Sequence, residues 1–352
     1  MTGTSGASSP TGRIVLVTGV SGVLGGRLAR RLSDDPGVAR VIGVDVVPPR
    51  GDLGSVRFVR ADIRNPVIAK VITQDDVDTV VHTSVASSPD VLGGRVSMKE
   101  HNIIGTMQLL AACQRAPGLE RLVVKSSAEV YGSSNRDPAM FTEDMGPRRV
   151  PRTGYGKDVL EIEGYVRGFA RRRPEVTVTV LRNAPLLSPT TPTALSDYLT
   201  LNPIPKVMGF DARIQMLHYD DLVGALHHAT LAGVAGTFNV AGEGVLPMSQ
   251  AVRRLERLVL PVPGFALSGF GSAVRRARLG MGSFSPDQLA YLTYGRGLDT
   301  SRMRNVLGFE ATRTTEETLG EFARAHPPAL LRTHPVVTVE NTVTGLLGGT
   351  HA

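Results

Sequence analysis

The chain has 352 residues, of which 41% are hydrophobic and 20% charged, enough for one large α/β unit with an appended part. It has no tryptophan and only 5% aromatic residues, which argues against a stacking platform for single-stranded nucleic acid. The formal charge of +7 is compatible with a solvated surface, an anionic substrate or a polymer partner. Because the positive runs, such as 171–173, are short and follow helical stretches, we expect no nucleic-acid partner.

The single cysteine and the apolar stretches indicate the cellular compartment in which the protein is expected. Cys113 lies in an apolar run and cannot form an internal disulfide, which indicates a small core residue and a reducing compartment. The longest weakly charged stretch, 258–274, is interrupted by prolines and glycines and is too broken for a transmembrane helix. We expect this stretch to cover a pocket, and we expect a cytoplasmic protein without membrane attachment.

Strand-like and helix-like segments alternate from Arg13 onward. Short β-branched runs predict strands, and apolar residues at helical spacing predict helices. The alternation predicts an α/β fold with a doubly wound parallel sheet of the Rossmann type, covered by helices on both faces. The predicted strands are 13–19, 38–45, 56–62, 77–84, 121–127 and 176–183, and the predicted helices are 22–32, 67–72, 99–116 and a run that begins at Tyr155.

The alternation loosens after about Thr190, where proline and glycine become frequent. We therefore predict a Rossmann domain for dinucleotide binding at 13–190, to which 214–240 returns. A smaller C-terminal substrate-binding region is expected at 191–213 and 241–325. Polar or proline- and glycine-rich ends predict a disordered leader at 1–12 and a tail at 326–352.

Glycines spaced three apart join the first predicted strand to the first predicted helix. Gly19, Gly22 and Gly25 allow a tight turn and a close approach of the backbone to a pyrophosphate at a helix N-terminus. Asp45, at the end of the next strand, can accept hydrogen bonds from ribose hydroxyls and repel a 2′-phosphate. The pattern predicts a dinucleotide cofactor, NAD in preference to NADP, with the nearby Arg50 as the argument for NADP.

Asp62 ends the third predicted strand and has two interpretations. Its carboxylate can contact the adenine amino group of a bound cofactor, or it can cap the N-terminus of the following helix.

Together these motifs carry a resemblance to a known family. The chain from about residue 13 to 322 resembles the extended short-chain dehydrogenases/reductases of the NAD-dependent epimerase/dehydratase group, typified by UDP-glucose 4-epimerase. The motifs are TGVSGVLG (18–25), Asp45, Asp62, VVHTS around His82, HNIIGT (101–106), SSAEVYG (126–132), the Tyr155 helix, LHYDDL (217–222), GTFNVAG (236–242) and LDTSRMRNVLGF (298–309). The cofactor contacts that the resemblance implies are Gly19, Ser21, Gly22, Val23, Leu24, Gly25, Asp45, Asp62, Ile63, Thr83, Ser84 and Asn102.

The resemblance also implies a chemistry, namely reversible hydride transfer between bound nicotinamide and a sugar carbon. In this family a tyrosine takes or gives the hydroxyl proton, a serine or threonine holds the substrate oxygen, and a lysine four residues after the tyrosine assists. Tyr155 stands at the tyrosine position and Ser127 at the hydroxyl position. Val159 stands where the lysine is expected.

The missing lysine matters because a free tyrosine has a pKa of about 10, so only about one part in a thousand is ionised at pH 7. Lys157 cannot take its place, because two helical residues are separated by roughly 200°. Lys157 does lie four residues after Thr153, but a threonine hydroxyl is a far weaker acid. Asp158 would raise the pKa of the phenol if it faced inward.

Other departures from the family pattern surround the same site. Pro185 takes the position of a substrate-contacting asparagine, Ser188 replaces a glycine, and Ser84 and Val85 replace two alanines. Two functions therefore stay open. One is an NAD-dependent epimerase, dehydratase or related oxidoreductase with an atypical active site, acting on a nucleotide-sugar. The other is a dinucleotide-binding regulatory or interaction protein with little or no turnover.

The outer region offers two candidate substrate contacts. Arg213 and Arg296 fall where family members hold a nucleotide diphosphate, and the planar guanidinium suits phosphate; the alternative is surface charge. The histidines are scattered and no cysteine or histidine spacing suggests a metal site. The resemblance also implies a possible homodimer, which would use the helices at 102–114 and 155–170.

Overall fold

The computed structural model describes residues 12–87, 94–151, 154–264 and 286–328. The predicted leader lies outside this range except for Gly12, as do most of the predicted tail and most of the 258–274 stretch. All distances and contacts below concern the described residues.

A seven-stranded parallel sheet in the order β11-β6-β5-β4-β1-β2-β3 forms the centre of the molecule. The order turns back beside β1, as expected for a doubly wound sheet that binds ligands at the carboxyl ends of its strands. The predicted fold class is confirmed. The strands are β1 (Arg13–Thr18), β2 (Val38–Asp45), β3 (Arg57–Arg60), β4 (Thr79–His82), β5 (Arg121–Ser127), β6 (Thr177–Asn183) and β11 (Gly236–Val240).

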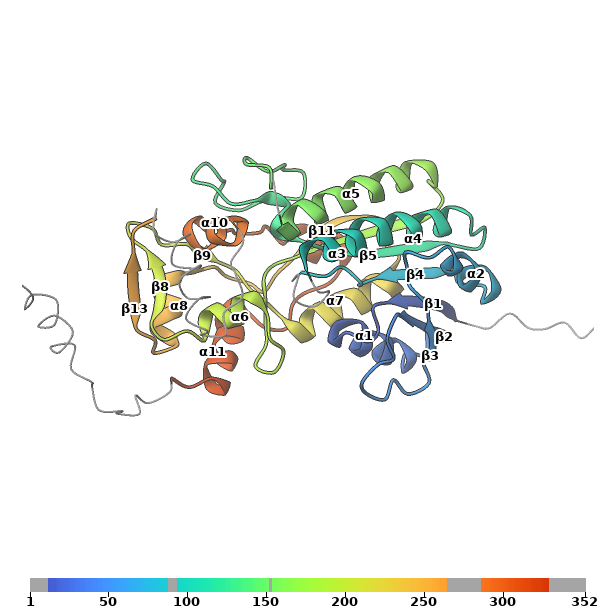
Figure 1. Cartoon of the computed structure of the whole chain (residues 1–352), viewed down its shortest axis with the longest axis horizontal. Helices are drawn as coiled ribbons and strands as arrows, with labels where there is room; N and C mark the ends of the chain where they lie inside the picture. The colour runs from blue at the N-terminus through green and yellow to red at the C-terminus, as the bar shows by residue number, and fades with distance from the viewer. Residues whose placement is uncertain (1–11, 88–93, 152–153, 265–285, 329–352) are drawn as a thin grey trace, which may run out of the picture.

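Helices cover both faces of the sheet (Figure 1). One face carries α1 (Val23–Ser33) and α7 (Tyr219–Ala232), which pack against each other. The other carries α2 (Val67–Gln74), α4 (Gly105–Gln114) and α5 (Gly154–Arg172). The buried strand residues are mainly valine, leucine and isoleucine, whose branched side chains suit a sheet covered on both sides.

The predicted helix at 99–116 is three segments in the structure. α3 (Arg95–Lys99) leads into a wider π-helical turn, η2 (Glu100–Ile104), and then into α4. Cys113 on α4 is fully buried, and this burial raises the pKa of its thiol to about 12. The prediction of a core cysteine is confirmed.

A smaller region with its own hydrophobic core lies beside the carboxyl end of the sheet, on the left in Figure 1. Leu298, Met303 and Leu307, within the range predicted for this region, belong instead to the core of the sheet. The elements outside the sheet are β7 (Leu186–Leu187), α6 (Ala194–Leu199), β8 (Ile204–Val207), β9 (Arg213–Ile214), β10 (Leu217–His218), β12 (Leu246–Pro247), α8 (Met248–Arg254), β13 (Val259–Val262), α10 (Pro286–Tyr294), η5 (Met303–Leu307) and α11 (Thr315–Ala325).

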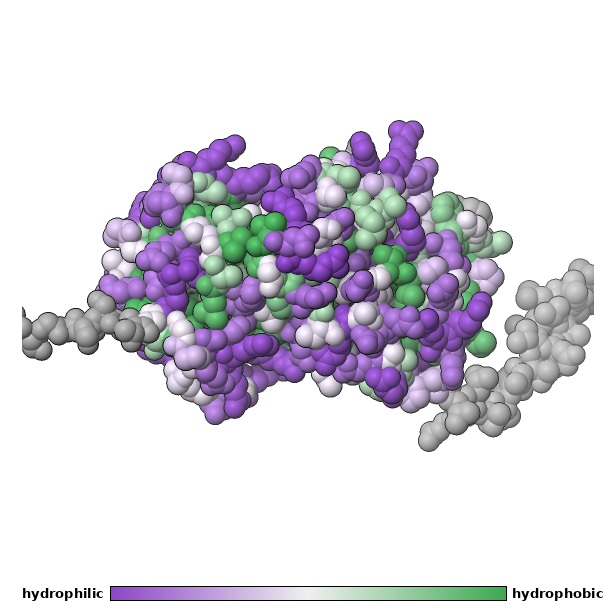
Figure 2. Space-filling view, turned by 180° about the vertical axis from the view of Figure 1, so that it is seen from behind, coloured by the Kyte–Doolittle hydropathy of each residue, from purple (hydrophilic) through white to green (hydrophobic). Residues whose placement is uncertain are grey.

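The surface is mixed in polarity. Figure 2 shows hydrophilic residues over most of one face, with hydrophobic residues in smaller groups between them. Among the described helices, none is both long enough and apolar enough to cross a bilayer.

Candidate active site

The loop between β1 and α1 has the geometry that its glycines predict. Gly19 has a φ of +78°, and a β-carbon there would lie 3.1 Å from the Cα of Ser84. A β-carbon on Gly25 would lie 2.2 Å from the carbonyl oxygen of Gly19, which no side chain can tolerate. Glycine is therefore required for the turn at Gly19 and for the close packing of α1 on the loop at Gly25.

The N-terminus of α1 opens at this loop. Gly22 is its N-cap and offers no side chain to bond the free backbone N–H groups, and the first turn, which begins with Val23 and Leu24, carries no acidic residue. Backbone N–H groups at the positive end of a helix dipole can bind an anion such as a pyrophosphate.

Asp45 ends β2 beside the same loop. One carboxylate oxygen accepts a hydrogen bond from the N–H of Ser21 at 3.0 Å and the other from the N–H of Val46 at 2.7 Å. The carboxylate is thus fixed next to the phosphate loop and partly exposed. Arg50 is exposed in the loop that follows β2.

Asp62 pairs with Arg64 rather than capping a helix. Its oxygens accept hydrogen bonds from the Arg64 side chain at 2.7–3.1 Å and from the Arg64 N–H at 2.9 Å. These bonds hold the pKa of Asp62 below its ordinary value. The N-cap interpretation is wrong, because α2 begins after Pro66 with no side-chain cap. Ile63 is buried, and a β-carbon on Gly105 would lie 2.7 Å from its side chain.

Thr83 and Ser84 follow β4 at the same edge of the sheet. Thr83 donates from its hydroxyl to the carbonyl of Thr18 at 2.5 Å, and the Ser84 hydroxyl lies 2.9 Å from Nε2 of His101. Asn102 is fully buried, and its amide bonds to the backbone of Ala86. Asn102 therefore holds the chain after β4 in place beside the predicted cofactor site.

Tyr155, in the first turn of α5, is paired with a lysine from another element. The ammonium of Lys125 on β5 lies 2.8 Å from the Tyr155 hydroxyl, and both side chains are buried. The same nitrogen lies 5.2 Å from the centre of the Tyr155 ring. Helical spacing from Tyr155 predicts only partners on the same helix, so it does not identify Lys125, which lies on a strand. The signal in the sequence is a lysine within an apolar strand, because lysine is rarely buried without a partner.

The electrostatic surroundings of Tyr155 are mixed. Burial raises the pKa of the phenol above its ordinary value, whereas the charge and hydrogen bond of Lys125 lower it; Glu129 and Asp158 add smaller upward contributions. Asp158 is fully buried, but both of its oxygens bond to the Arg95 guanidinium, at 2.6 and 2.5 Å. This ion pair neutralises the charge of Asp158. The ammonium of Lys125, in contrast, contacts the phenol directly.

Ser127 ends β5, and its hydroxyl accepts a hydrogen bond from the N–H of Glu129 at 3.2 Å. Asn183 is paired with Ser127 in the parallel register of β5 and β6. The amide nitrogen of Asn183 donates to the carbonyl of Ala184, but its Oδ1 is buried with no hydrogen-bond partner in the described part of the chain. A buried polar atom without a partner is costly unless a ligand satisfies it. Asn183 is thus a candidate ligand contact that the sequence analysis missed.

The departures from the family pattern have structural explanations. Val159 is 0% exposed and packs in the main core. Lys157 forms an exposed ion pair with Glu161 at 3.9 Å, so it points away from the site as expected. Thr153 lies outside the described residues. Pro185 accepts a hydrogen bond from Leu217 through its carbonyl, which joins β7 to β10.

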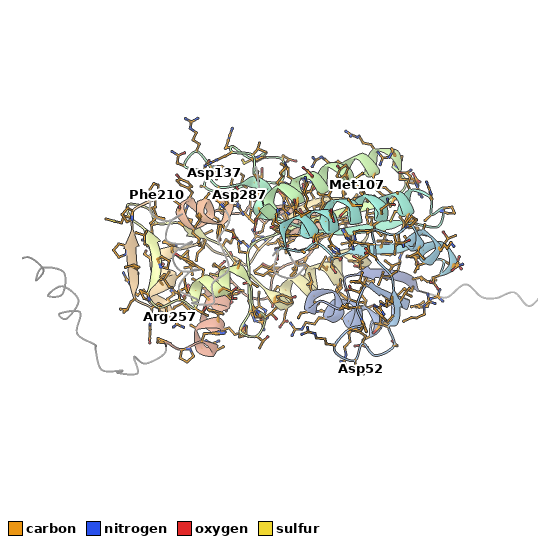
Figure 3. The ribbon with its side chains drawn as sticks, in the orientation of Figure 1. Asp52, Met107, Asp137, Phe210, Arg257 and Asp287 are labelled. Atoms are coloured by element: carbon orange, nitrogen blue, oxygen red, sulfur yellow. The ribbon has the colours of Figure 1, made fainter. Side chains whose placement is uncertain are left out.

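A cavity of about 260 Å³ lies between the motif after β5 and the smaller region. Both predicted arginines line it, and Arg296 is buried while Arg213 is exposed. Arg296 donates to the carbonyl of Gly132 at 2.9 Å and to the Ser133 hydroxyl at 3.1 Å, but its Nη1 has no partner among the described residues. Figure 3 labels two other lining residues, Asp137 and Phe210, near α10.

The described ranges hold no group of three or more histidine, cysteine, aspartate or glutamate residues placed to bind a metal ion. Buried His82 bonds instead to the hydroxyls of Thr18 and Thr106, at 2.9 and 3.0 Å. Burial lowers its pKa to about 3.

Solved structures with similar folds include nucleotide-sugar enzymes. A dTDP-glucose 4,6-dehydratase from Bacillus anthracis, in complex with NAD, is 20% identical with a TM-score of 0.65, and the match covers 89% of this chain and 96% of that one. A UDP-glucose 4-epimerase from Thermotoga maritima, with UDP-glucose, is 19% identical with a TM-score of 0.65, covering 89% and 98%. At these identities the likeness shows the shared fold alone.

Sequence comparison adds relatives and a family. The uncharacterized protein Rv0501 of Mycobacterium tuberculosis is 48% identical over 339 residues, which are 95% of this chain and 90% of that protein. UDP-glucose 4-epimerase 2 of Oryza sativa is 29% identical over 188 residues, 48% of this chain and 44% of that protein. The model of the NAD dependent epimerase/dehydratase family matches residues 15–241. The chain therefore belongs to the NAD dependent epimerase/dehydratase family.

Proposed function

We propose that this protein is an NAD-dependent epimerase or dehydratase that acts on a nucleotide-activated sugar. The observation that carries the proposal is the position of Arg296. This arginine comes from the smaller region, is anchored to Gly132 and Ser133 at the end of the SSAEVYG motif, and presents a buried Nη1 that has no hydrogen-bond partner among the described residues. A diphosphate held there would place its attached sugar beside the residues that end β5.

The cofactor side supports NAD. The N-terminus of α1, where the close approach at Gly25 admits only a glycine, suits a pyrophosphate. The carboxylate of Asp45, held by the Ser21 N–H, suits the ribose hydroxyls. A carboxylate at this position repels a 2′-phosphate, which favours NAD over NADP. We assign Ser21, Ile63, Thr83 and Ser84 to the same proposed cofactor site, since Ser21 bonds to Asp45 and the other three follow β3 and β4 at the carboxyl edge of the sheet. A nicotinamide held by these residues would supply reversible hydride transfer to and from a sugar carbon.

The chain's own residues carry the proton. In the forward direction Tyr155 takes the proton of the sugar hydroxyl as the carbon loses its hydride, which leaves a ketone; in the reverse direction Tyr155 gives the proton back. Ser127 orients the hydroxyl by hydrogen bonding. Proton transfer is assigned to Tyr155 because its buried phenol has a cationic partner. Orientation of the substrate is assigned to Ser127 because it lies at the carboxyl end of a central strand.

The alternative of a binding protein without turnover rests on Val159 and on the other departures from the family pattern, at Ser84, Val85, Pro185 and Ser188. The contact between Lys125 and Tyr155 weakens that argument, since a cation is present from another direction. A panel of nucleotide-sugars, assayed with NAD for epimerised, dehydrated or oxidised products by mass spectrometry, separates the two functions. Product from at least one nucleotide-sugar supports the enzyme. NAD binding with no product across the panel supports the binding protein.

A further inference from the structure

The buried pair of Lys125 and Tyr155 joins two central elements of the fold. Lys125 lies on β5, between β4 and β6 in the middle of the sheet, and is 7% exposed. Tyr155 lies on α5, which packs against β5 and the turn that follows it. Placing an ammonium in such a position is costly unless it interacts with a specific partner, and here it donates a hydrogen bond to the Tyr155 phenol at 2.8 Å.

We propose that Lys125 replaces, from β5, the lysine that members of this family carry one turn after the active-site tyrosine, and that it is the cation that activates the Tyr155 phenol. The inference deepens the proposed function and rests on it for its catalytic meaning. Neither the family match nor the relatives assign a role to this lysine.

The hydrogen bond has a fixed direction. An ammonium has three donors and no acceptor, so the phenol oxygen accepts from Lys125. The phenol's own proton is then left to point elsewhere, toward the oxygen of a bound sugar. When the phenol is ionised, the same ammonium stabilises the phenolate with an opposite charge at hydrogen-bond distance. One contact thus serves both the acid and the base form of Tyr155.

The strand also brings Lys125 to the side of β5 that carries Ser127. Side chains two residues apart on a strand share a side, as Lys125 and Ser127 do on β5. The cation and the hydroxyl that would orient the substrate therefore come from one rigid element. This placement leaves position 159 of the helix to the core, where Val159 is fully buried.

The other charged groups around the phenol do not replace Lys125. Glu129 from η3 (Ala128–Tyr131) and Asp158 from α5 act against the phenolate, and Asp158 is neutralised by Arg95 from α3. Burial and, to a smaller extent, the charges of His101 and Lys125 lower the pKa of His82 on β4 to about 3, so His82 is neutral at neutral pH. Lys125 therefore supplies the positive charge that meets the phenol directly.

The test follows the ionisation of position 155 without any substrate. A fluorinated tyrosine, whose phenol is more acidic than that of tyrosine, is introduced at position 155 of the full chain and titrated by fluorine NMR. Lys125→Met should raise the midpoint by about one to three pH units, the size of effect expected when a close opposite charge is lost. Lys125→Gln, which keeps an N–H donor but no charge, should also raise it. The control Lys157→Met removes the exposed lysine paired with Glu161 and should leave the midpoint unchanged.

A relocation variant completes the design. The double variant Lys125→Ser/Val159→Lys moves the cation to the helix position four residues after the tyrosine. Its titration midpoint at position 155 should fall back toward that of the unsubstituted chain. Unchanged midpoints in both Lys125→Met and Lys125→Gln would overturn the inference, whatever the turnover. Raised midpoints in a protein that converts no nucleotide-sugar would support the role of Lys125 and count against the proposed function.

Discussion

The hydroxyl of Tyr155 accepts a hydrogen bond from Lys125, which lies thirty residues earlier in the chain. The helix position four residues after the tyrosine is occupied by Val159, which is buried in the core. The catalytic pair expected on one helix is thus divided between a helix and a central strand.

Tyr155→Phe removes the phenol oxygen and keeps the ring. Because proton transfer by a positioned group contributes about 10²- to 10⁴-fold to a rate, we expect turnover of the nucleotide-sugar to fall by that factor while NAD affinity is retained. Tyr165→Phe, a partly exposed tyrosine on the same helix, is the matched control. Wild-type turnover in Tyr155→Phe would remove Tyr155 from the mechanism.

Asp45→Ser tests the choice of cofactor. The substitution removes the carboxylate that bonds to the Ser21 N–H and is proposed to bind ribose hydroxyls. We expect NAD affinity to fall about tenfold or more, the cost of losing a charged hydrogen-bond partner, and the preference over NADP to shrink. Calorimetric titration with each cofactor measures both effects. Asp52→Ser, in the loop after β2, should change neither, and equal preference for NAD in Asp45→Ser and the unsubstituted chain would contradict the assignment.

Gly25→Ala tests the contact between α1 and the phosphate loop. Its β-carbon would lie 2.2 Å from the Gly19 carbonyl oxygen, so the backbone must shift. We expect the free energy of unfolding to drop by about 1–3 kcal/mol, as for other overpacked sites, and NAD affinity to drop as well. Gly51→Ala adds a β-carbon with no atom within 4 Å and should have little effect on either quantity. Denaturant unfolding and calorimetry provide the comparison.

The buried His82 predicts a specific dependence of stability on pH. Its pKa is lowered from 6.5 to about 3 by burial, so between these values the proton binds mainly to the unfolded chain. The contribution of His82 to the free energy of unfolding is fully present above pH 6.5. It is lost as the pH falls toward 3, and the free energy of unfolding then changes by up to about 1.4 kcal/mol per pH unit. Urea unfolding across this range should show a shallower slope for His82→Gln. The same slope in both proteins would show that His82 does not carry the effect.

Asn183→Ala tests the buried Oδ1 that has no partner beside Ser127. If a substrate hydroxyl satisfies this oxygen, kcat/KM should fall about tenfold, the cost of one hydrogen bond. Because the substitution also removes the hydrogen bond from the Asn183 amide to the Ala184 carbonyl, the free energy of unfolding should fall by about 1 kcal/mol. A loss of stability with unchanged kcat/KM would assign Asn183 a structural role. Asn65→Ala, in the exposed turn before α2, controls for the substitution itself.

The sequence predicts the fold well because its signals are local. Periodicity places the six predicted strands within a few residues, and the glycines at 19, 22 and 25 mark the phosphate loop through the turn they allow. The wide turn of η2 inside the predicted helix at 99–116 is missed, because apolar spacing does not distinguish a π-helical turn from an α-helical one.

The active site is less predictable because its contacts are not local. Helical spacing from Tyr155 points only to residues of α5, whereas Lys125 contacts the phenol because α5 packs on β5. In the same way, Asn183 meets Ser127 only through the register of two strands. Spacing along one element identifies neither contact, although a lysine inside a buried strand and an asparagine at a strand end are visible signals.

The most direct measurement of the central claim is a single-turnover reaction with stoichiometric NAD and each nucleotide-sugar of the panel, followed by the absorbance of reduced nicotinamide and by mass spectrometry of the products. We expect transient reduction or a converted sugar for at least one substrate with the unsubstituted chain, and the same change about 10²- to 10⁴-fold more slowly with Tyr155→Phe. Identical traces from the two proteins, or conversion that needs no nicotinamide cofactor, would contradict it.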